Sequence, residues 1–202
     1  MTLITRLFRC ATAIVLLSGL AACVSIEPTL DADITPDAKS AYISGEFTRT
    51  KFTGIAYVVE SVDGKNQYLL PMGKDTAMPS AVKLQTVAMK IPPGTYHIIE
   101  WVTYATVTKE IFRRNEVKNP FMREPFTIKA GNVVHLGRFE VDGTRTTNYP
   151  TTYMKWSVVP QPIMQSDAQS AFVQTYPKLA DLPFRCVMCV DTVMAAAKAV
   201  AP

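Results

Sequence analysis

The residues most able to take part in chemistry are the two cysteines of the motif Cys186-Val-Met-Cys189. Two cysteines at this spacing can form a disulfide in an oxidising compartment if the chain turns between them, remain as packed thiols, or serve redox or metal chemistry. A redox role needs the motif in a βα unit, which the sequence does not indicate. Haem attachment needs a histidine where Val190 stands, and metal binding needs further ligands, for which only His97 and His135 exist. We therefore favour a structural disulfide between Cys186 and Cys189.

The two histidines, His97 and His135, lie in runs typical of β-strands. If those strands were neighbours, the pair could hold a metal with Glu100 or Asp142, but simple alternation places Glu100 on the face opposite His97. Partnered or half-exposed strand histidines are the favoured interpretation. A Ser-His-Asp arrangement stays open, although no Gly-x-Ser-x-Gly elbow occurs. We predict no catalytic residues, no metal site, no cofactor and no enzyme activity.

Two tryptophans, Trp101 and Trp156, and several tyrosines could stack on a sugar ring. Aromatic side chains at strand spacing more often pack in a core. An exposed aromatic cluster in a groove would favour glycan binding, and burial of both tryptophans in one core would argue against it.

The first 22 residues have the layout of an export signal. Arg6 and Arg9 form a positive segment, residues 11–20 are mostly apolar, and Ala21 and Ala22 are small residues before a cleavage point. The apolar run is shorter than the about 20 residues of a transmembrane helix. An ordinary signal cut after Ala22 and an uncleaved anchor are the alternatives to lipidation.

The order Leu20-Ala21-Ala22-Cys23 resembles the lipobox of bacterial lipoproteins. The resemblance implies cleavage between Ala22 and Cys23 and a diacylglyceryl group on the Cys23 sulfur, with three acyl chains in all. More than one chain gives stable membrane binding. Val24 stands where Asp favours inner-membrane retention in Gram-negative lipoproteins, so we expect a lipid anchor in the outer membrane, with the protein facing the periplasm.

Removal of residues 1–22 leaves 180 residues, enough for one domain with a sizeable core. The signal takes Arg6 and Arg9 with it, so 19 of the 21 basic residues remain against 17 acidic ones, a net charge of +2. This near balance argues against nucleic-acid binding.

We divide the rest of the chain into three parts. Residues 23–40 are predicted to form a lipidated tether with two prolines, in which Asp31 and Asp33 give only a weak calcium signal. Residues 41–160 are predicted to form an antiparallel β-sandwich of about seven or eight strands, and residues 161–202 a helical C-terminal segment.

Alternating apolar residues and turn signals define the expected strands. Asp63-Gly64 and Asp142-Gly143 are expected to be turns, Gly131-Asn132 another, and Gly137 a β-bulge that reconciles two inward faces in 133–141. Residues 109–124 are charged and predict a long loop or a poor edge strand. Residues 54–60 are expected to pair with 67–72, and a central strand is expected over 95–107 with Tyr96, Ile98, Val102 and Tyr104 on one face. Four further strands are each expected to place alternate residues on one face: Ile43, Gly45 and Phe47; Val87, Met89 and Ile91; Phe126, Ile128 and Ala130; and Met154, Trp156 and Val158.

Two pieces, Pro92-Pro93-Gly94-Thr95-Tyr96 and Phe126 to Gly137, resemble small bacterial lipoproteins with transthyretin-like or carboxypeptidase-regulatory-like β-sandwiches. In that group an aromatic residue, usually Tyr, is commoner where His135 stands. The resemblance spans roughly residues 84–141. It implies a sandwich fold and no reaction, because the shared motifs are turns and strands.

Two helices are expected after Pro160. Ser166 and Gln169 would form a capping box for a helix that carries Ala171, Phe172 and Tyr176 on one face. Asp191 would cap a final helix over 192–200.

These features favour a non-enzymatic, lipid-anchored envelope protein that docks to an envelope protein partner or assembly. A glycan-binding or peptidoglycan-binding module is the alternative. An enzyme would require a pocket with convergent titratable groups.

Overall fold

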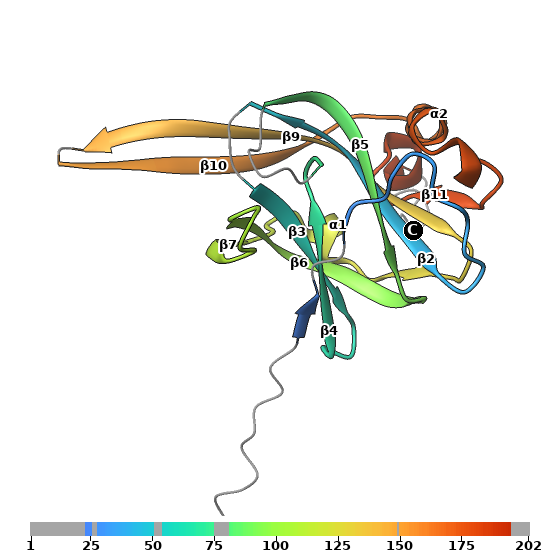
Figure 1. Cartoon of the computed structure of the whole chain (residues 1–202). Coiled ribbons are helices and arrows are strands. Elements are labelled where there is room, and N and C mark those ends of the chain that lie inside the picture. Colours follow the sequence, from blue (N-terminus) through green and yellow to red (C-terminus); the bar gives the residue numbers. More distant parts are fainter. Residues whose placement is uncertain (1–22, 26–27, 51–53, 75–80, 149, 195–202) are drawn as a thin grey trace, which may run out of the picture.

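The computed structural model of the chain describes residues 23–25, 28–50, 54–74, 81–148 and 150–194, and these fold into two sheets (Figure 1). Sheet A has the order β1 (Cys23–Ser25), β4 (Asn66–Pro71), β3 (Gly54–Ser61), β6 (Gly94–Tyr104) and β7 (Ile111–Glu116), and β8 (Phe126–Ile128) also pairs with β6. Sheet B has the order β10 (Thr151–Gln161), β9 (Val133–Asn148), β2 (Ala41–Arg49) and β5 (Val82–Ile91), and β11 (Phe184–Cys186) also pairs with β9.

The prediction of a mainly β, two-sheet protein is confirmed, but its finer form was wrong. The described sheets contain six and five strands, more than the seven or eight expected. They are also mixed, because β1 runs parallel to β4, and both β2 and β11 run parallel to β9. Parallel neighbours need long connections, which local sequence patterns do not reveal.

The main core lies between the sheets and is built from alternate strand residues. Phe47, Tyr57 and Phe139 form its aromatic centre, with ring centroids 5.7 Å apart for Phe47–Phe139 and 5.1 Å for Tyr57–Phe139. The face predicted for Val87, Met89 and Ile91 is confirmed, because all three are buried in this core.

Gly137 forms the predicted bulge in β9. Its φ is +124°, and the pairing of β2 with β9 shifts between Ser44–His135 and Glu46–Arg138. Val134 and Leu136 before the bulge therefore share the core with Phe139 and Val141 after it. Glycine is required here, because a Cβ would lie 3.0 Å from the Cβ of Met188 in addition to the strained φ.

A second irregularity, in β6, contradicts the predicted face. Tyr96 and Ile98 point into the core, whereas Val102 and Tyr104 belong to a separate buried cluster on the other face of sheet A. The pairing register shifts between Val58–Glu100 and Val59–Ile98, so one extra residue reverses the alternation.

The Asp142-Gly143 turn was also wrong, since both residues lie inside β9 and pair with Ser157 and Trp156. The strand continues to Asn148, and β9 and β10 form a long hairpin that projects from the body (Figure 1). We call residues 142–148 and 151–157 the arm. Threonine-rich sequence suits strands, which explains why the hairpin extends past the glycine.

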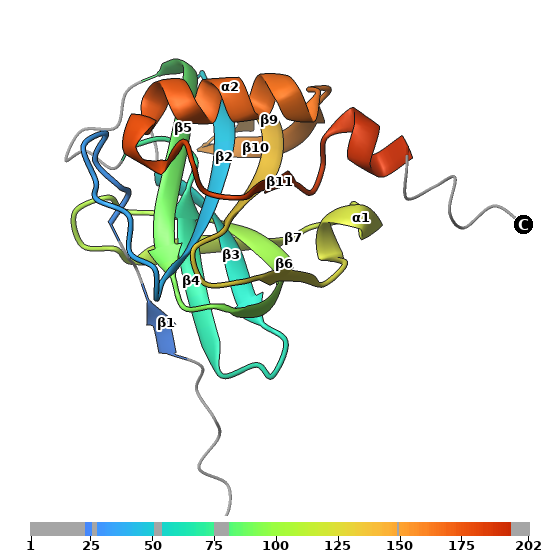
Figure 2. The ribbon, with the colours of Figure 1, turned by 90° about the vertical axis from the view of Figure 1, so that its right-hand side faces the viewer.

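The C-terminal segment covers the outer face of sheet B. Helix α2 (Gln165–Thr175) crosses β5, β2 and β9 (Figure 2), followed by η1 (Pro177–Leu179) and β11. Phe172 and Tyr176 pack there with Tyr42. The capping box was wrong, because Met164 is the N-cap and makes no side-chain cap bond.

The final helix starts at Val190, one residue before the predicted cap, and its described part ends at Met194. Asp191 accepts a hydrogen bond from the backbone N–H of Gln165 (3.1 Å), so it ties this helix to α2. The rest of the helix predicted over 192–200 lies outside the described residues.

The predicted tether lies against the domain over its described residues. Cys23–Ser25 form β1, Leu30 is buried, and the Leu30 N–H donates to the carbonyl of Ala88 at 2.8 Å. The Asp37 N–H donates to the Tyr42 hydroxyl oxygen at 2.7 Å.

Candidate functional site

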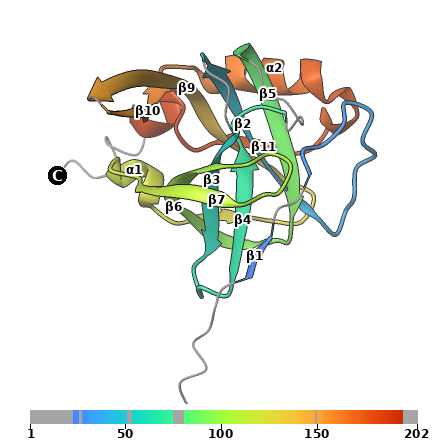
Figure 3. The same cartoon turned by 60° about the vertical axis from the view of Figure 1, so that its left-hand side comes forward.

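A groove of about 560 Å³ opens at one edge of the sandwich. One wall comes from β6, β7 and the short helix α1 (Pro120–Arg123), and the other from β10 (Figure 3). This volume falls within the range of small-molecule and cofactor sites. The lining residues are Tyr57, Trp101, Asn115, Glu116, Val117, Lys118, Asn119, Met122 and residues 156–160.

Trp101 and Trp156 reach this groove from opposite sheets. Both indoles are half-buried and pack against the main core while they line the groove. Gly143 makes room for Trp156, because a Cβ at that position would lie 2.6 Å from the indole Cζ3. The two tryptophans are therefore neither fully buried nor free on the surface, and each presents part of its ring to a ligand.

The groove also contains a polar group without a partner. The Nδ2 atom of Asn115 is buried and has no hydrogen-bond partner among the described residues. A buried amide donor of this kind is costly unless a ligand or water satisfies it. Deeper in the groove lies Tyr57, whose pKa is raised well above 10 by burial, so its hydroxyl stays neutral.

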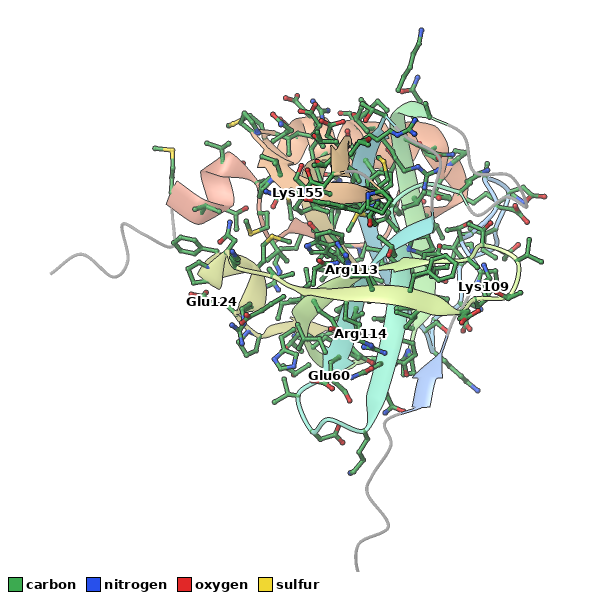
Figure 4. The ribbon with its side chains drawn as sticks, turned by 90° about the vertical axis from the view of Figure 1, so that its left-hand side faces the viewer. Glu60, Lys109, Arg113, Arg114, Glu124 and Lys155 are labelled. Carbon is green, nitrogen blue, oxygen red and sulfur yellow. A yellow bond between two sulfur atoms is a disulfide. The ribbon has the colours of Figure 1, made fainter. Side chains whose placement is uncertain are left out.

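Cationic side chains surround the groove. Lys118 lines it, and Figure 4 shows Arg113 on β7 and Lys155 on the arm on the same side of the molecule. Among the described residues, neither Arg113 nor Lys155 forms an ion pair. The acid in the lining, Glu116, is engaged by Arg123 at 2.8 Å.

The structure keeps His97 and His135 apart. His97, on the outer face of sheet A, lies with its Nε2 3.1 Å from Glu60 Oε2. The β6 bulge places Glu100 on this same face, opposite Val58, so the predicted separation of Glu100 from His97 was wrong. His135 is buried under the C-terminal segment, in ring contact with Phe184.

His135 belongs to a buried polar layer on the outer face of sheet B. Its Nδ1 and the Ser44 hydroxyl share a hydrogen bond of 2.8 Å, and its Nε2 has no partner among the described residues. Burial, and secondarily Arg138, lower the pKa of His135 to about 3. Ser44 and His135 are both fully buried, so the pair is closed off from solvent in this structure.

Glu46 lies in the same layer and pairs with Arg138, whose Nη2 is 2.9 Å from Glu46 Oε2. Burial raises the pKa of Glu46, and the hydrogen bond from Arg138 opposes that shift. The arrangement is typical of structural polar groups held by a tight cover.

Cys186 and Cys189 are joined by a disulfide, with Cα atoms 5.5 Å apart. Both are fully buried beside Ile163 and Ala168. The chain bends at Val187 and Met188, which brings the two sulfurs to the same side. Burial removes them from solvent reagents and suits a structural role.

Cys23 begins β1 at the edge of sheet A, and Ala22 lies outside the described residues. Within the described residues, no helix is long and apolar enough to span a bilayer, and no cluster of three or more His, Cys, Asp or Glu side chains could hold a metal.

The groove was not predicted from the sequence. Asn115, Lys118 and Met122 lie in the charged stretch 109–124, which was expected to be a loop or poor edge strand and contains the edge strand β7 and α1. The one usable signal was Asn119 before Pro120, because the Asn119 side chain accepts from the Phe121 N–H and starts α1. No known family model and no curated protein matches this chain.

Proposed function

We propose that this chain is a non-enzymatic, lipid-anchored protein of the bacterial outer membrane that faces the periplasm and binds an envelope partner at the groove and arm. The observation that carries the proposal is the open edge between β7 and β10, where residues 156–160 of the projecting hairpin's second strand line a groove that also contains Trp101. The Leu20-Ala21-Ala22-Cys23 order supports the anchor.

The arm is suited to a protein partner because it presents Tyr153, which is 43% exposed, and Val159 follows the arm on β10 and is 48% exposed. A two-stranded hairpin has little stability of its own, so contact with a partner would stabilise the arm by burying its exposed side chains. Aromatic anchors are enriched among the residues that dominate interface energies.

Photo-crosslinking in intact envelopes tests this proposal. A photoreactive residue at Tyr153 should capture one protein in stoichiometric amount, and the same residue at Leu84, exposed on the opposite edge strand β5, should not. Identical products from both positions would contradict a specific partner at the arm.

A glycan ligand is the second candidate, and the two indoles favour it. Aromatic faces stack on sugar rings, the Asn115 amide can donate to a hydroxyl or carbonyl, and the nearby cations suit a glycan with carboxylates. Co-sedimentation with purified murein should fall at least tenfold in Asn115→Leu, which leaves both tryptophans in place. Thr144→Ala on the arm is the matched control. Unchanged sedimentation of Asn115→Leu would rule out this candidate at the groove.

A further inference from the structure

The residue predicted to carry the lipid begins a strand of the domain. In β1, Cys23 pairs with Asn66, Val24 with Gln67 and Ser25 with Tyr68, in parallel with β4. Soon afterwards the chain is fixed again at Leu30, which is buried under sheet B. A lipid on Cys23 would therefore hold the body directly at the membrane, without a free spacer.

Two turns lie at this end of the molecule. The β3–β4 turn covers residues 61–66 and the β5–β6 turn covers residues 92–94, and residues of both line one shallow pocket. The Val62 N–H donates to the carbonyl of Thr95, directly after the second turn, at 3.0 Å. We call these two turns the rim. Figure 1 shows β1 beside the β3–β4 end of the body, while the arm projects sideways near the opposite end.

The surface of the rim carries exposed apolar residues and has no net charge. Val62 is 53% exposed, and Pro92 and Pro93 are exposed beside it. The charges of Asp63 and Lys65 cancel in an ion pair of 3.1 Å, and Asp63 also accepts from the Ser61 hydroxyl at 2.7 Å. Such a surface can contact lipid headgroups without leaving an isolated charge unsatisfied.

The distance between the Cys23 backbone and the rim determines how close the rim lies to the bilayer. Adjacent strands are about 5 Å apart and residues along a strand about 3.3 Å, so Gly64 lies within roughly 10 to 15 Å of the Cys23 backbone. An acylated cysteine has its glycerol at the headgroup level. We propose that the rim rests on the lipid surface that holds the Cys23 acyl chains, and that the arm is held at a distance from that surface. This inference rests on the proposed lipidation.

Fluorescence quenching on lipidated, full-length protein tests the inference. The lipid occupies Cys23 and the disulfide occupies Cys186 and Cys189, so Val62→Cys and, on the arm, Asn148→Cys each provide a single labelling site. In vesicles of phosphatidylethanolamine and phosphatidylglycerol with a headgroup-linked nitroxide, the label at residue 62 should be quenched at least threefold more than the label at 148. Equal quenching would overturn the inference.

A linker variant supplies the matched control. A valine followed by twenty Gly and Ser residues, inserted between Cys23 and Val24, keeps the Cys-Val order and adds a mean reach of about 25 Å. Quenching at residue 62 should fall to the level at 148, and unchanged quenching would show that the rim does not depend on the short attachment, which also overturns the inference. Intact mass of the mature N-terminus separates the two proposals. An unmodified Cys23 defeats both, whereas a lipidated protein with equal quenching defeats only this one.

Discussion

Polar and aromatic side chains lie on the outer face of sheet B and also at the edge between β7 and β10, but they are buried at the first place and partly exposed at the second. Under α2, Ser44, Glu46 and His135 are fully buried and aromatic rings pack among themselves. At the open edge, two half-buried indoles and an unpartnered amide face a groove. The covered face therefore supplies stability, while the open edge keeps surface available for binding.

The largest expected effect is at the covered face. Phe172 is 1% exposed and its ring lies 5.3 Å from Tyr176 and 5.5 Å from Phe184. Phe172→Ala should lower the free energy of unfolding by about 3–5 kcal/mol because it leaves a cavity. Denaturant unfolding measures this, and Gln174→Ala, exposed on the same helix, is the control. A loss below 1 kcal/mol would contradict the view that the covered face supplies stability.

Acid should weaken the covered face next. The folded-state pKa of His135 is lowered from 6.5 to about 3, so the unfolded chain binds a proton that the folded chain does not. Stability from this residue is fully present above pH 6.5 and is lost as the pH falls towards 3, by a few kcal/mol. The raised pKa of Glu46 acts in the opposite direction, because stability from this residue rises as the pH falls through its raised value towards 4.5. Glu46 is present in both the wild type and a His135 variant, so the difference between the two isolates the contribution of His135.

Unfolding followed against pH should show this loss in the wild type. His135→Asn keeps a group that can bond Ser44 and removes the titration, so its stability should change much less between pH 6.5 and 4.5. The substitution His97→Asn, on the other sheet, should leave the wild-type slope in place. An equal slope in His135→Asn would assign the acid sensitivity elsewhere.

The disulfide should contribute less to the free energy of unfolding than Phe172 does, because it closes a loop between residues only three apart. Replacing both Cys186 and Cys189 with Ala should lower stability by about 2 kcal/mol. Crosslinking at Tyr153 should persist in the folded variant. Loss of partner capture with little loss of stability would instead indicate that the pair contributes to partner binding.

At the open edge, Gly143→Ala should act on the groove more than on the fold. The new Cβ would displace the Trp156 indole, at a cost of about 1 kcal/mol. Tryptophan emission and murein or partner binding should both change. Thr144→Ala, the exposed neighbour, should change neither, and a silent Gly143→Ala would show that the Trp156 position is not tightly set.

The smallest stability effect is expected on the arm. Tyr153→Ser removes a side chain that is 43% exposed, so the unfolding free energy should stay within about 0.5 kcal/mol of the wild type. Recovery of the envelope partner by pull-down should nevertheless fall. A large loss of stability would mean that the arm packs more closely than its exposure indicates.

Local features of this fold were predictable because they depend on neighbouring residues. The turns at Gly64 and Gly131 have φ values of +70° and +72°, as glycine at a turn suggests, and the switch of inward residues around Gly137 predicted its bulge. In β6 no glycine marked the irregularity, so its face was predicted wrongly. Backbone bulges without a glycine leave little trace in a sequence.

Long-range features were not predictable. The groove joins Trp101 to Trp156 across two sheets, and nothing in either strand indicates which strand will face it. The parallel pairing of β2 with β9 likewise depends on segments far apart in the chain. Asn115 is distinguished only by its tertiary surroundings, where its amide lacks a partner.

That pairing of β2 with β9 has a consequence for the order of folding. Ser44 and His135 meet across 91 residues, so sheet B cannot close until most of the polypeptide is available. The strands of sheet A all lie before Val133, whereas β2 lacks its neighbour β9 until that point in the chain. Nascent fragments that end before Val133 should accordingly leave β2 more open to proteases than it is in the full chain.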